Sequence, residues 1–468
     1  MFGLGLLGGG VATTCWLLEQ GARVTVTDIK DAKQLAPSVR RVEEYLKKIA
    51  RDGKAYEKLR VRLTWALGGH SHALIDAAQI VVANPDVTLQ NPFIQRALNR
   101  GIVVANEGTL FYDTWKKKTI GITGTRGKTT TAHWTHHFIS GSLLAGNSTT
   151  KPFQSVMDSV APVAVTELSS FILEHFDRVR RGPQVAVITN LYRDHLNRHG
   201  TMEEYARTKA VIFARQGKDD VLILNHDDDW AAWFARRHTA GRVRYTSFRP
   251  LPAELEGVWY TDGAVYERVG EKTRNVLDVS SVAERWGRHN MANLLAATLA
   301  ARACGVSWSV IQSKVASLPQ VPYRQEVVHR DRAVTIVNDT TATSPEGGIA
   351  AVERWGGPNC ILIAGGTNRD LDYRSWAQAL KGRIRPTNLI LLAGSATDAM
   401  RKVLGPWGRG IRSYDTLEQA WRAARKRSGL FISSIVLFSP AAKSFGLFAN
   451  EFDRGQQFNQ IVKREFGT

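Results

Sequence analysis

Three α/β domains in tandem are the fold class that this sequence predicts, and three observations lead to it. Glycine-rich turns between a strand and a helix occur twice, at 3–8 and at 121–127. Apolar segments of strand length alternate with helix-like segments along the chain, which is typical of parallel sheets covered by helices. A break at 318–322 interrupts this alternation, which then resumes. We expect domain boundaries that give three segments: 1–113, 114–318 and 319–468.

The first domain is predicted from the turn Gly3-x-Gly5-x-x-Gly8, a helix-like segment, and a strand at 24–27 that leads into Asp28. This order is typical of a Rossmann-like fold. Its glycines let the backbone approach a diphosphate, and its later acid accepts hydrogen bonds from a ribose or a base. A glycine-rich turn of any α/β domain is the alternative, because a single motif of this kind is weak. Strands at 80–82 and 102–104 extend the predicted sheet.

The second domain begins with an apolar strand at 119–123 that leads into the loop Gly121-Ile-Thr-Gly124-Thr-Arg-Gly127-Lys128-Thr129-Thr130. Such a P-loop directs backbone N–H groups at phosphate oxygens. Lys128 would reach the β- and γ-phosphates, and the Thr129 hydroxyl would bind Mg²⁺. The spacing departs from the usual phosphate-loop motif because Ile122 stands where its first glycine is expected. A chance Gly-Lys-Thr triplet is the alternative, and the strand–loop–helix context argues against it.

The rest of the chain continues the same alternation. Two more strands follow in the central domain, at 163–166 and 185–189, and two helices are expected at 293–304 and 308–317. The third domain is expected to be Rossmann-like as well, with strands at 334–337, 360–364, 389–392 and 435–438.

Candidate site residues follow the central strands. Glu167 ends one strand and His195 follows another, so both belong to the carboxyl edge of the sheet, where ligands of α/β proteins bind. Taken alone, Glu167 could equally be a helix-start acid, His195 a surface residue and Lys209 a solvated helix lysine. Asn290 and Asn293 would share one helix face and could contact an adenine or a ribose, while Asn290 could instead cap the helix.

Composition excludes several classes of protein. The 468 residues are 43% hydrophobic and 22% charged, which excludes a disordered or collagen-like chain. The three cysteines, Cys15, Cys304 and Cys360, show no CxxC spacing. This excludes a disulfide framework and a thiolate zinc site, and it suits a reducing cytoplasm.

Charge raises the question of nucleic-acid binding. Lysine and arginine total 62 against 43 acids, a net charge of +19, but the basic residues form short, scattered groups without a long tail. General solubility is the favoured explanation and anionic small substrates the second, so we expect no nucleic-acid partner. The uncharged residues 1–18 lack the basic start of a signal peptide, so we expect a soluble, cytoplasmic protein that does not bind membranes.

Several motifs in order along the chain resemble the Mur ligase family, most closely its D-glutamate-adding members. They are the P-loop with its unusual glycine spacing, Glu167-Leu-Ser-Ser-Phe-Ile-Leu-Glu174, Asn190 to Gly200, Gly287 to Asn293, Asn338 to Pro345, and Ser439-Pro-Ala-Ala-Lys-Ser444-Phe445. The resemblance covers nearly the whole chain. It implies an ATP-dependent ligase of peptidoglycan synthesis, monomeric, that joins D-glutamate to UDP-N-acetylmuramoyl-L-alanine through an acyl phosphate.

The resemblance also implies roles for individual residues. Lys128, Glu167, His195 and Lys209 would be catalytic; two Mg²⁺ ions would be held by Thr129, Glu167, His195 and Lys209, the last as a carbamate. ATP would be bound by Gly124, Thr125, Arg126, Gly127, Lys128, Thr129, Thr130, Asn290, Asn293, Arg324 and Asp339. The two other substrates would be bound by Gly5, Asp28, Asn147, Thr343, Arg369, Ser444 and Phe445.

The chain departs from the family pattern at several of these positions. Thr341 replaces a lysine expected near the nascent acyl phosphate, and Tyr323 replaces a histidine before Arg324. Arg369 stands where the family has a substrate-binding lysine, and Leu7 stands where a phosphate-binding threonine is common. We expect these changes to affect substrate detail and rate more than the class of reaction. Arg369 becomes the main cation expected in the acceptor pocket.

Other functions remain open at this point. A folylpolyglutamate-type ligase normally lacks a separate domain before the P-loop domain, and the diaminopimelate-adding ligase carries an Asp-Asn-Pro-Arg segment that this sequence does not contain. A degenerate homologue that only binds nucleotide is a further alternative, which loss of Lys128, Glu167 or His195 would favour. All three residues are present. A basic, nucleic-acid-binding ATPase is the remaining option.

Overall fold

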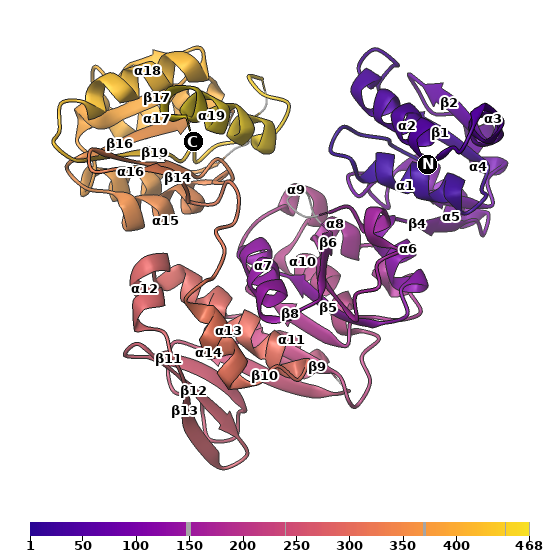
Figure 1. Cartoon of the computed structure of the whole chain (residues 1–468), viewed down its shortest axis with the longest axis horizontal. Coiled ribbons are helices and arrows are strands. Elements are labelled where there is room, and N and C mark those ends of the chain that lie inside the picture. The colour runs from indigo at the N-terminus through magenta and orange to yellow at the C-terminus, as the bar shows by residue number, and fades with distance from the viewer. Residues whose placement is uncertain (147–150, 239, 368–370, 445, 468) are drawn as a thin grey trace. The chain divides into compact units, whose positions relative to one another are not determined.

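The structure is a computed structural model of the whole chain, and it describes residues 1–146, 151–238, 240–367, 371–444 and 446–467. The chain divides into two compact units, Met1–Pro319 and Gln320–Thr468. Three α/β regions with their own sheets follow one another along the chain (Figure 1), which confirms the predicted fold class. The predicted boundary near residue 113 falls inside the first unit and stays a prediction.

The first region is a small parallel sheet that Phe2 completes. Strands β1 (Val24–Asp28) and β2 (Leu63–Leu67) pair in parallel, as do β3 (Ile80–Val82) and β4 (Val103–Ala105). Phe2 bridges to Thr27 on one side and to Ala83 on the other, so this single residue stands where a first strand is expected. The helices are α1 (Gly9–Glu19), α2 (Ala36–Ile49), α3 (Gly53–Arg60), α4 (His72–Asp76), α5 (Pro92–Asn99) and α6 (Glu107–Thr114).

The central sheet has nine strands in the order β13-β12-β11-β10-β9-β8-β5-β7-β6. Strands β5 to β11 run parallel, and β12 and β13 add an antiparallel edge. Their bounds are Lys118–Thr123, Leu143–Gly146, Val163–Glu167, Val185–Ile188, Val221–Asn225, Arg242–Ser247, Gly257–Thr261, Ala264–Val269 and Lys272–Asp278 for β5 to β13. The strands predicted at 119–123, 163–166 and 185–189 are therefore confirmed.

Helices cover both faces of this sheet because successive strand residues alternate between two cores. Val165 belongs to the core with helices α7 (Lys128–Phe138) and α13 (Arg288–Ala303), whereas its neighbour Ala164 belongs to the core with α6 and α10 (Met202–Ala210). The other helices of this region are α8 (Ser170–Leu173), α9 (Leu196–His199), α11 (Ala231–Arg237), α12 (Ser280–Trp286) and α14 (Trp308–Val315).

The second unit contains a six-stranded sheet in the order β14-β15-β19-β16-β17-β18, with only β14 antiparallel to its neighbour. The strands are β14 (Glu326–Arg330), β15 (Val334–Asn338), β16 (Cys360–Gly365), β17 (Leu389–Leu392), β18 (Ser413–Tyr414) and β19 (Ser434–Phe438). The helices are α15 (Pro345–Trp355), α16 (Arg374–Lys381), α17 (Ser395–Leu404), α18 (Leu417–Ser428) and α19 (Glu451–Phe466). All four strands predicted here are present.

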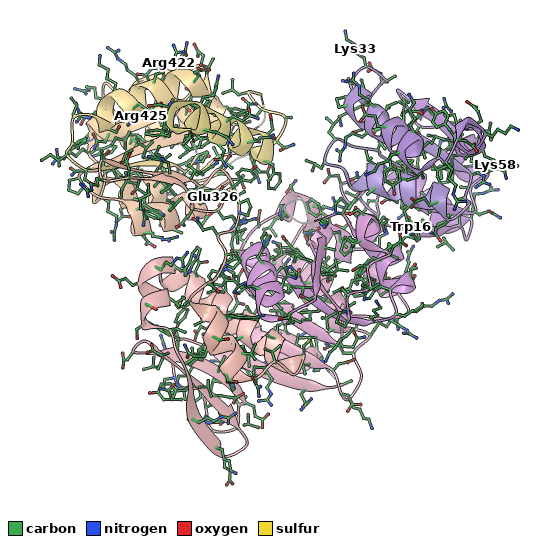
Figure 2. The ribbon with its side chains drawn as sticks, viewed as in Figure 1. Trp16, Lys33, Lys58, Glu326, Arg422 and Arg425 are labelled. Atoms are coloured by element: carbon green, nitrogen blue, oxygen red, sulfur yellow. The ribbon has the colours of Figure 1, made fainter. Side chains whose placement is uncertain are left out.

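The surface charge is spread over many elements. Lys33, Lys58 and Arg422 are exposed on three different helices or loops, and Figure 2 shows their side chains extending outward. Within the described part of the chain, no helix has the length and apolar character needed to cross a bilayer.

Candidate active site at the phosphate loop

The loop between β5 and α7 is shaped by two glycines that no other residue could replace without strain. Gly124 and Gly127 have φ angles of 141° and 81°, which side chains rarely adopt. A Cβ atom on Gly124 would lie 2.0 Å from the Thr189 hydroxyl, and one on Gly127 would lie 2.1 Å from Oδ1 of Asn293. The backbone therefore passes closely over its neighbours and presents the start of α7, a site that favours anions.

Hydrogen bonds hold this loop in place. The backbone N–H groups of Thr125 and Arg126 donate to Asn190, to its carbonyl at 3.0 Å and to its Oδ1 at 2.8 Å. The Lys128 ammonium folds back over the loop and donates to the carbonyls of Gly124 and Thr125 at 3.0 and 3.1 Å. Its charge therefore lies above the N–H groups that would meet a phosphate. The next two residues, Thr129 and Thr130, are buried in the first turn of α7.

Glu167 ends β7, the strand next to β5, and is paired in register with Ile122. Its side chain is 1% exposed. Thr129 and Glu167 offer hard oxygen donors, which fit Mg²⁺. No group of three or more His, Cys, Asp and Glu side chains with metal-ligand spacing occurs among the described residues, so Mg²⁺ held here would need further oxygen from phosphate or water.

His195 connects to the loop through Asp194. His195 has φ 54° and directly precedes α9, with its Nε2 3.7 Å from Oδ2 of Asp194. The same carboxylate oxygen lies 3.3 Å from Nη1 of Arg126 in the P-loop. The His195 ring packs edge-on against Phe171, with ring centroids 5.0 Å apart. The predicted histidine is thus near the loop, and its role as a metal ligand stays a prediction.

Lys209 is buried beneath the P-loop, so the interpretation as a solvated helix lysine is wrong. It is 1% exposed, and its ammonium donates to the Gly124 carbonyl at 3.0 Å. The Thr123 hydroxyl lies 3.5 Å away, and the Tyr205 ring centroid lies 4.5 Å from the nitrogen. Burial, with a contribution from Lys128, holds the pKa of Lys209 well below its ordinary value. Burial therefore disfavours the charged form of Lys209 directly under the loop.

Asn290 and Asn293 face the same loop from helix α13. Asn293 donates to Oδ1 of Asn290 at 2.9 Å and accepts from the Thr131 hydroxyl at 3.4 Å. Asn290 itself donates to the Trp286 carbonyl at 3.0 Å. Gly287 holds the N-cap position of α13, so the alternative in which Asn290 caps this helix is wrong.

In the first region, Asp28 shapes the glycine turn. Its Oδ2 accepts hydrogen bonds from the backbone N–H groups of Leu4 and Gly5 at 2.8 and 3.2 Å, and its Oδ1 accepts from that of Lys30 at 2.9 Å. Glu107 lies over the start of α1, where a Cβ on Gly9 would meet its Oε2 at 2.3 Å. Burial raises the pKa of Glu107 to about 7.

The second unit contains the other predicted nucleotide residues, Arg324 and Asp339. Asp339 is buried at the end of β15, accepting from the Ser439 hydroxyl at 2.7 Å and from the Gln325 N–H at 3.1 Å. Burial raises its pKa to about 7, which these bonds and the charges of Arg324 and Arg354 oppose. A protonated carboxyl group would donate, and an ionised one accept, so this residue suits a polar ligand.

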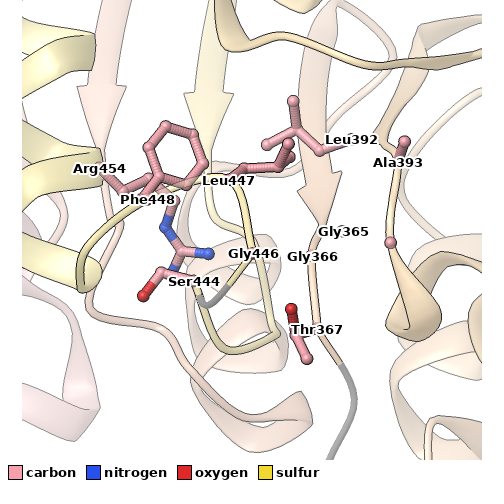
Figure 3. Close-up of a pocket in the computed structure, with 11 residues that line it drawn as sticks. Gly365, Gly366, Thr367, Leu392, Ala393, Ser444, Gly446, Leu447, Phe448 and Arg454 are labelled. Atoms are coloured by element: carbon pink, nitrogen blue, oxygen red, sulfur yellow. The ribbon is translucent and has the colours of Figure 1, made fainter. Parts of the chain in front are cut away.

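Outside the first region, five residues are predicted to bind the acceptor or the muramoyl substrate. The structure describes two of them, Thr343 and Ser444. Thr343 accepts a hydrogen bond from the Lys443 ammonium at 3.3 Å, and Ser444 is buried in the wall of a cavity of about 270 Å³ (Figure 3). The other three predicted residues, Asn147, Arg369 and Phe445, lie outside the described residues.

Three polar residues near these sites were not predicted: Asp194, Lys443 and Arg454. Lys443 brings a cation to Thr343, near the position where Thr341 replaces a lysine. Arg454 lines the same cavity as Ser444. A signal for Arg454 does exist, because it precedes the buried residues Phe458, Ile461 and Val462 at helical spacing and thus belongs to the buried face of α19.

Comparison with known sequences identifies relatives of similar length. Residues 122–301 match the Mur ligase middle domain. The chain is 33% identical to the UDP-N-acetylmuramoylalanine–D-glutamate ligase of Roseiflexus sp. (strain RS-1), with 99% of this chain and 97% of that protein covered. It is 34% identical to the ligase of the same name from Anaeromyxobacter dehalogenans (strain 2CP-C), with the same coverage.

Solved structures show the same fold at lower identity. The UDP-N-acetylmuramate–alanine ligase of Thermotoga maritima is 17% identical with a TM-score of 0.58, covering 99% of this chain and 98% of that one. The UDP-N-acetylmuramoylalanyl-D-glutamyl-2,6-diaminopimelate–D-alanyl-D-alanyl ligase of Acinetobacter baumannii gives the same identity and TM-score, over 84% and 92% of the two chains. With its P-loop, its three successive sheets and its full-length relatives, the chain belongs to the Mur ligase family.

Proposed function

We propose that this chain is an ATP-dependent ligase that joins D-glutamate to UDP-N-acetylmuramoyl-L-alanine in peptidoglycan synthesis. The observation that carries the proposal is identity of 33–34% over 99% of the chain to ligases of that name. The P-loop, with Lys128 above it and Lys209 beneath it, is consistent with that reaction. As the site of action we propose the cytoplasm, and as the active species the monomer, which light scattering would test.

The reaction needs ATP because a carboxylate is a poor electrophile. Transfer of the γ-phosphoryl group to a carboxylate oxygen gives ADP and an acyl phosphate. The amine of D-glutamate then attacks the acyl carbon, the bond from carbon to the phosphate oxygen breaks, and phosphate leaves with the electron pair while the nitrogen loses a proton. The Lys128 ammonium neutralises charge on the transferred group, which is the main contribution a protein can make to phosphoryl transfer.

We propose that Thr129, Glu167, His195 and Lys209 hold Mg²⁺. When bound, Mg²⁺ supplies charge neutralisation and alignment of the phosphate oxygens. The chain itself holds the phosphates with the loop N–H groups, keeps Glu167 desolvated next to them, and orients His195 through Asp194. Imidazole is an unusual ligand for this ion, which prefers oxygen donors.

Lys209 would join that set as a carbamate. Its buried amine has a lowered pKa, so burial favours the neutral form, which is the form that reacts with carbon dioxide. The nitrogen forms a bond to the carbon of carbon dioxide and releases a proton, which turns the amine into a carboxylate-like oxygen ligand. A carbamate is negatively charged, so it would attract Mg²⁺, whereas the ammonium form of Lys209 would repel it.

The carbamate can be tested by chemical rescue. Lys209→Ala should be almost inactive and should regain activity when acetate or propionate is added, because a small carboxylate can occupy the vacated space. Lys218→Ala, a matched change at a surface lysine, should behave as wild type. A carbamate signal from ¹³C-labelled carbon dioxide should be present in the wild type and absent in Lys209→Ala. Normal activity and Mg²⁺ dependence in Lys209→Ala would contradict the role.

We propose that the remaining predicted residues bind the substrates. For ATP these are Gly124, Thr125, Arg126, Gly127, Thr130, Asn290, Asn293, Arg324 and Asp339. For UDP-N-acetylmuramoyl-L-alanine they are Gly5, Asp28 and Asn147, and for D-glutamate they are Thr343, Arg369, Ser444 and Phe445.

The function is tested by offering the purified protein UDP-N-acetylmuramoyl-L-alanine, ATP and Mg²⁺ with one acceptor at a time. Phosphate release and product mass are measured with D-glutamate, L-glutamate, L-lysine and meso-diaminopimelate. D-Glutamate should give the highest kcat/KM. Preference for another acceptor would favour a different ligase of the family, and nucleotide binding without release of phosphate would favour a regulatory homologue.

A further inference from the structure

Arg454 is a fully buried arginine whose guanidinium group is only partly satisfied. It lies in the first turn of α19 and is 0% exposed. Its Nε donates to the Thr340 hydroxyl at 2.9 Å, and its Nη2 donates to the carbonyls of Thr340 and Ala442 at 2.7 and 3.1 Å. Among the described residues, its Nη1 has no hydrogen-bond partner. One side of the guanidinium is thus fixed, and the other is available.

The available side of the guanidinium faces a cavity. Arg454 and Ser444 both line the cavity of about 270 Å³ between β16, β17 and the loop before α19, and in Figure 3 the guanidinium extends from α19 toward Ser444. A Cβ atom on Gly366, in the wall of the cavity, would lie 3.5 Å from Nη1. The Ser444 hydroxyl is buried and also lacks a hydrogen-bond partner among the described residues.

A second property of the cavity limits its occupant. Leu392, Leu447 and Phe448 supply apolar walls, so a ligand there would have an aliphatic part as well as a polar end. Two buried donors without acceptors and an apolar wall fit a carboxylate on a short methylene chain. An aromatic ligand would leave the two donors without an acceptor. A purely ionic ligand would make no favourable contact with the apolar walls.

The charge of Arg454 also has no carboxylate in direct contact among the described residues. No carboxylate forms an ion pair with it within the described residues, and burial lowers its pKa to about 10 although Glu451 and Asp339 oppose this. A buried cation without an anion is unfavourable unless a ligand supplies the anion. The three hydrogen bonds that Arg454 does make go to neutral carbonyl and hydroxyl oxygens. They therefore do not neutralise the charge of the guanidinium.

We propose that Nη1 of Arg454 and the Ser444 hydroxyl together bind the side-chain carboxylate of the acceptor amino acid, which makes Arg454 the residue that selects glutamate over glutamine. The proposal rests on the proposed function and adds Arg454 to the residues expected to bind the acceptor, among which Arg369 is the main cation and Ser444 a hydroxyl donor. The side-chain carboxylate is the one assigned because it is the end farther from the amine. The amine has to remain free to attack the acyl phosphate, so an enclosed cavity suits the opposite end.

Three acceptors separate the two carboxylates in a kinetic test. D-Glutamine lacks the charge of the side-chain carboxylate, and D-isoglutamine lacks that of the α-carboxylate. Replacing the guanidinium by an apolar chain of similar length, Arg454→Met, should raise the KM for D-glutamate by about tenfold or more, the loss of one charge-assisted hydrogen bond. The preference for D-glutamate over D-glutamine should fall by the same factor, and that over D-isoglutamine should not change. The KM for ATP should stay the same.

A matched control separates selectivity from stability. Asn338 donates to the Gly455 carbonyl at 3.0 Å and so holds α19 without lining the cavity. Asn338→Ala should lower the melting temperature and leave the preference for D-glutamate over D-glutamine unchanged. Equal loss of D-glutamate and D-glutamine activity in Arg454→Met, or the same change of preference in both variants, would overturn the proposal.

A binding measurement tests the cavity without chemistry. Glutarate has the two carboxylates of glutamate and no amine, so it cannot react, and its dissociation constant is measured by calorimetry on the full chain. Binding should weaken about tenfold or more in Arg454→Met and severalfold in Ser444→Ala, a milder change that serves if Arg454→Met fails to fold. If D-glutamate is not ligated and glutarate binding still depends on Arg454, the proposed function is wrong and the carboxylate site stands. Equal glutarate binding by wild type and both variants would overturn the site.

Discussion

At the scale of single residues, Lys128 allows the sharpest test of the phosphate loop. Its ammonium contacts two loop carbonyls and is part of no apolar core, so its loss should affect catalysis much more than folding. Lys128→Ala should lower the rate of phosphate release by at least about a hundredfold. The melting temperature should stay close to that of the wild type.

A lysine outside the loop provides the control for this change. Lys116 is exposed, donates to the Asp113 carbonyl and precedes β5, at the opposite end of that strand from Lys128, so Lys116→Ala should keep the wild-type rate. A Lys128→Ala enzyme that retains turnover within about tenfold of wild type would contradict the assignment of the loop.

Sequence patterns predict a residue of this site only where a fixed spacing between residues identifies a motif. The P-loop glycines and Lys128 could be predicted because a short loop must combine specific residues with a strand and a helix. The role of Lys209 is implied by the family resemblance alone, since nothing in its own helix shows that the loop will cover it. Helical spacing puts Arg454 on the buried face of α19, but it does not show that the guanidinium will line a cavity, because that depends on what packs on the helix.

At the scale of elements, the segment after α8 contains a buried histidine that should make stability depend on pH. His175 is 1% exposed, neither of its ring nitrogens has a partner among the described residues, and burial lowers its pKa from 6.5 to about 4. Below pH 6.5 the unfolded chain binds a proton here that the folded chain does not. The free energy of unfolding should therefore fall as pH falls from 6.5 toward 4, by up to about 3 kcal/mol.

Replacement of this histidine isolates its contribution. His175→Leu removes the titrating group, so urea unfolding between pH 7 and pH 4.5 should show a shallower loss of stability than in the wild type. His72→Gln, at an exposed position, should keep the wild-type slope. Equal slopes for wild type and His175→Leu would show that His175 does not titrate in this way.

A buried ion pair connects α9 to the end of α8, and its arginine also bonds to the loop after β3. Arg198 donates to both oxygens of Glu174 at 2.6 and 2.7 Å and to the carbonyl of Pro85 at 2.8 Å, and both charged side chains are about one-tenth exposed. Arg198→Met should destabilise the protein by about 3–5 kcal/mol, because Glu174 is left buried without its partner. The double variant Arg198→Met, Glu174→Leu should be more stable than Arg198→Met alone. Additive losses in a urea unfolding cycle would contradict the coupling.

Elements differ in how well the sequence predicts them. Strand β16 is an uninterrupted apolar run and β7 begins with one, as is typical of strands buried on both faces, and both are predicted within a residue or two. The antiparallel strands β12 and β13 carry charged residues on a half-exposed surface, so periodicity does not separate them from loops. The first strand is reduced to Phe2, because one residue pairs on both sides there.

At the scale of the whole molecule, the second unit has the features of an independently folding domain. Residues 320–468 form a compact unit with a complete six-stranded sheet and a buried core on each face of it. Expressed alone, they should give a cooperative thermal transition and the circular dichroism of an α/β protein. A fragment that stays unfolded would contradict this division of the chain. A fragment cut inside the sheet, such as 360–468, lacks β14 and β15 and should not fold.

Helix α7 contacts the end of the first unit as well as the phosphate loop. The helix begins at Lys128 in the phosphate loop, and two turns later the buried Trp134 donates from its indole N–H to the carbonyl of Pro319, the last residue of that unit. Helix α7 therefore begins in the phosphate loop and, farther along, contacts the last residue of the first unit. Any axial shift or rotation of α7 would have to stretch or break this hydrogen bond to Pro319. A single helix thus connects the phosphate loop to the last residue of the first unit.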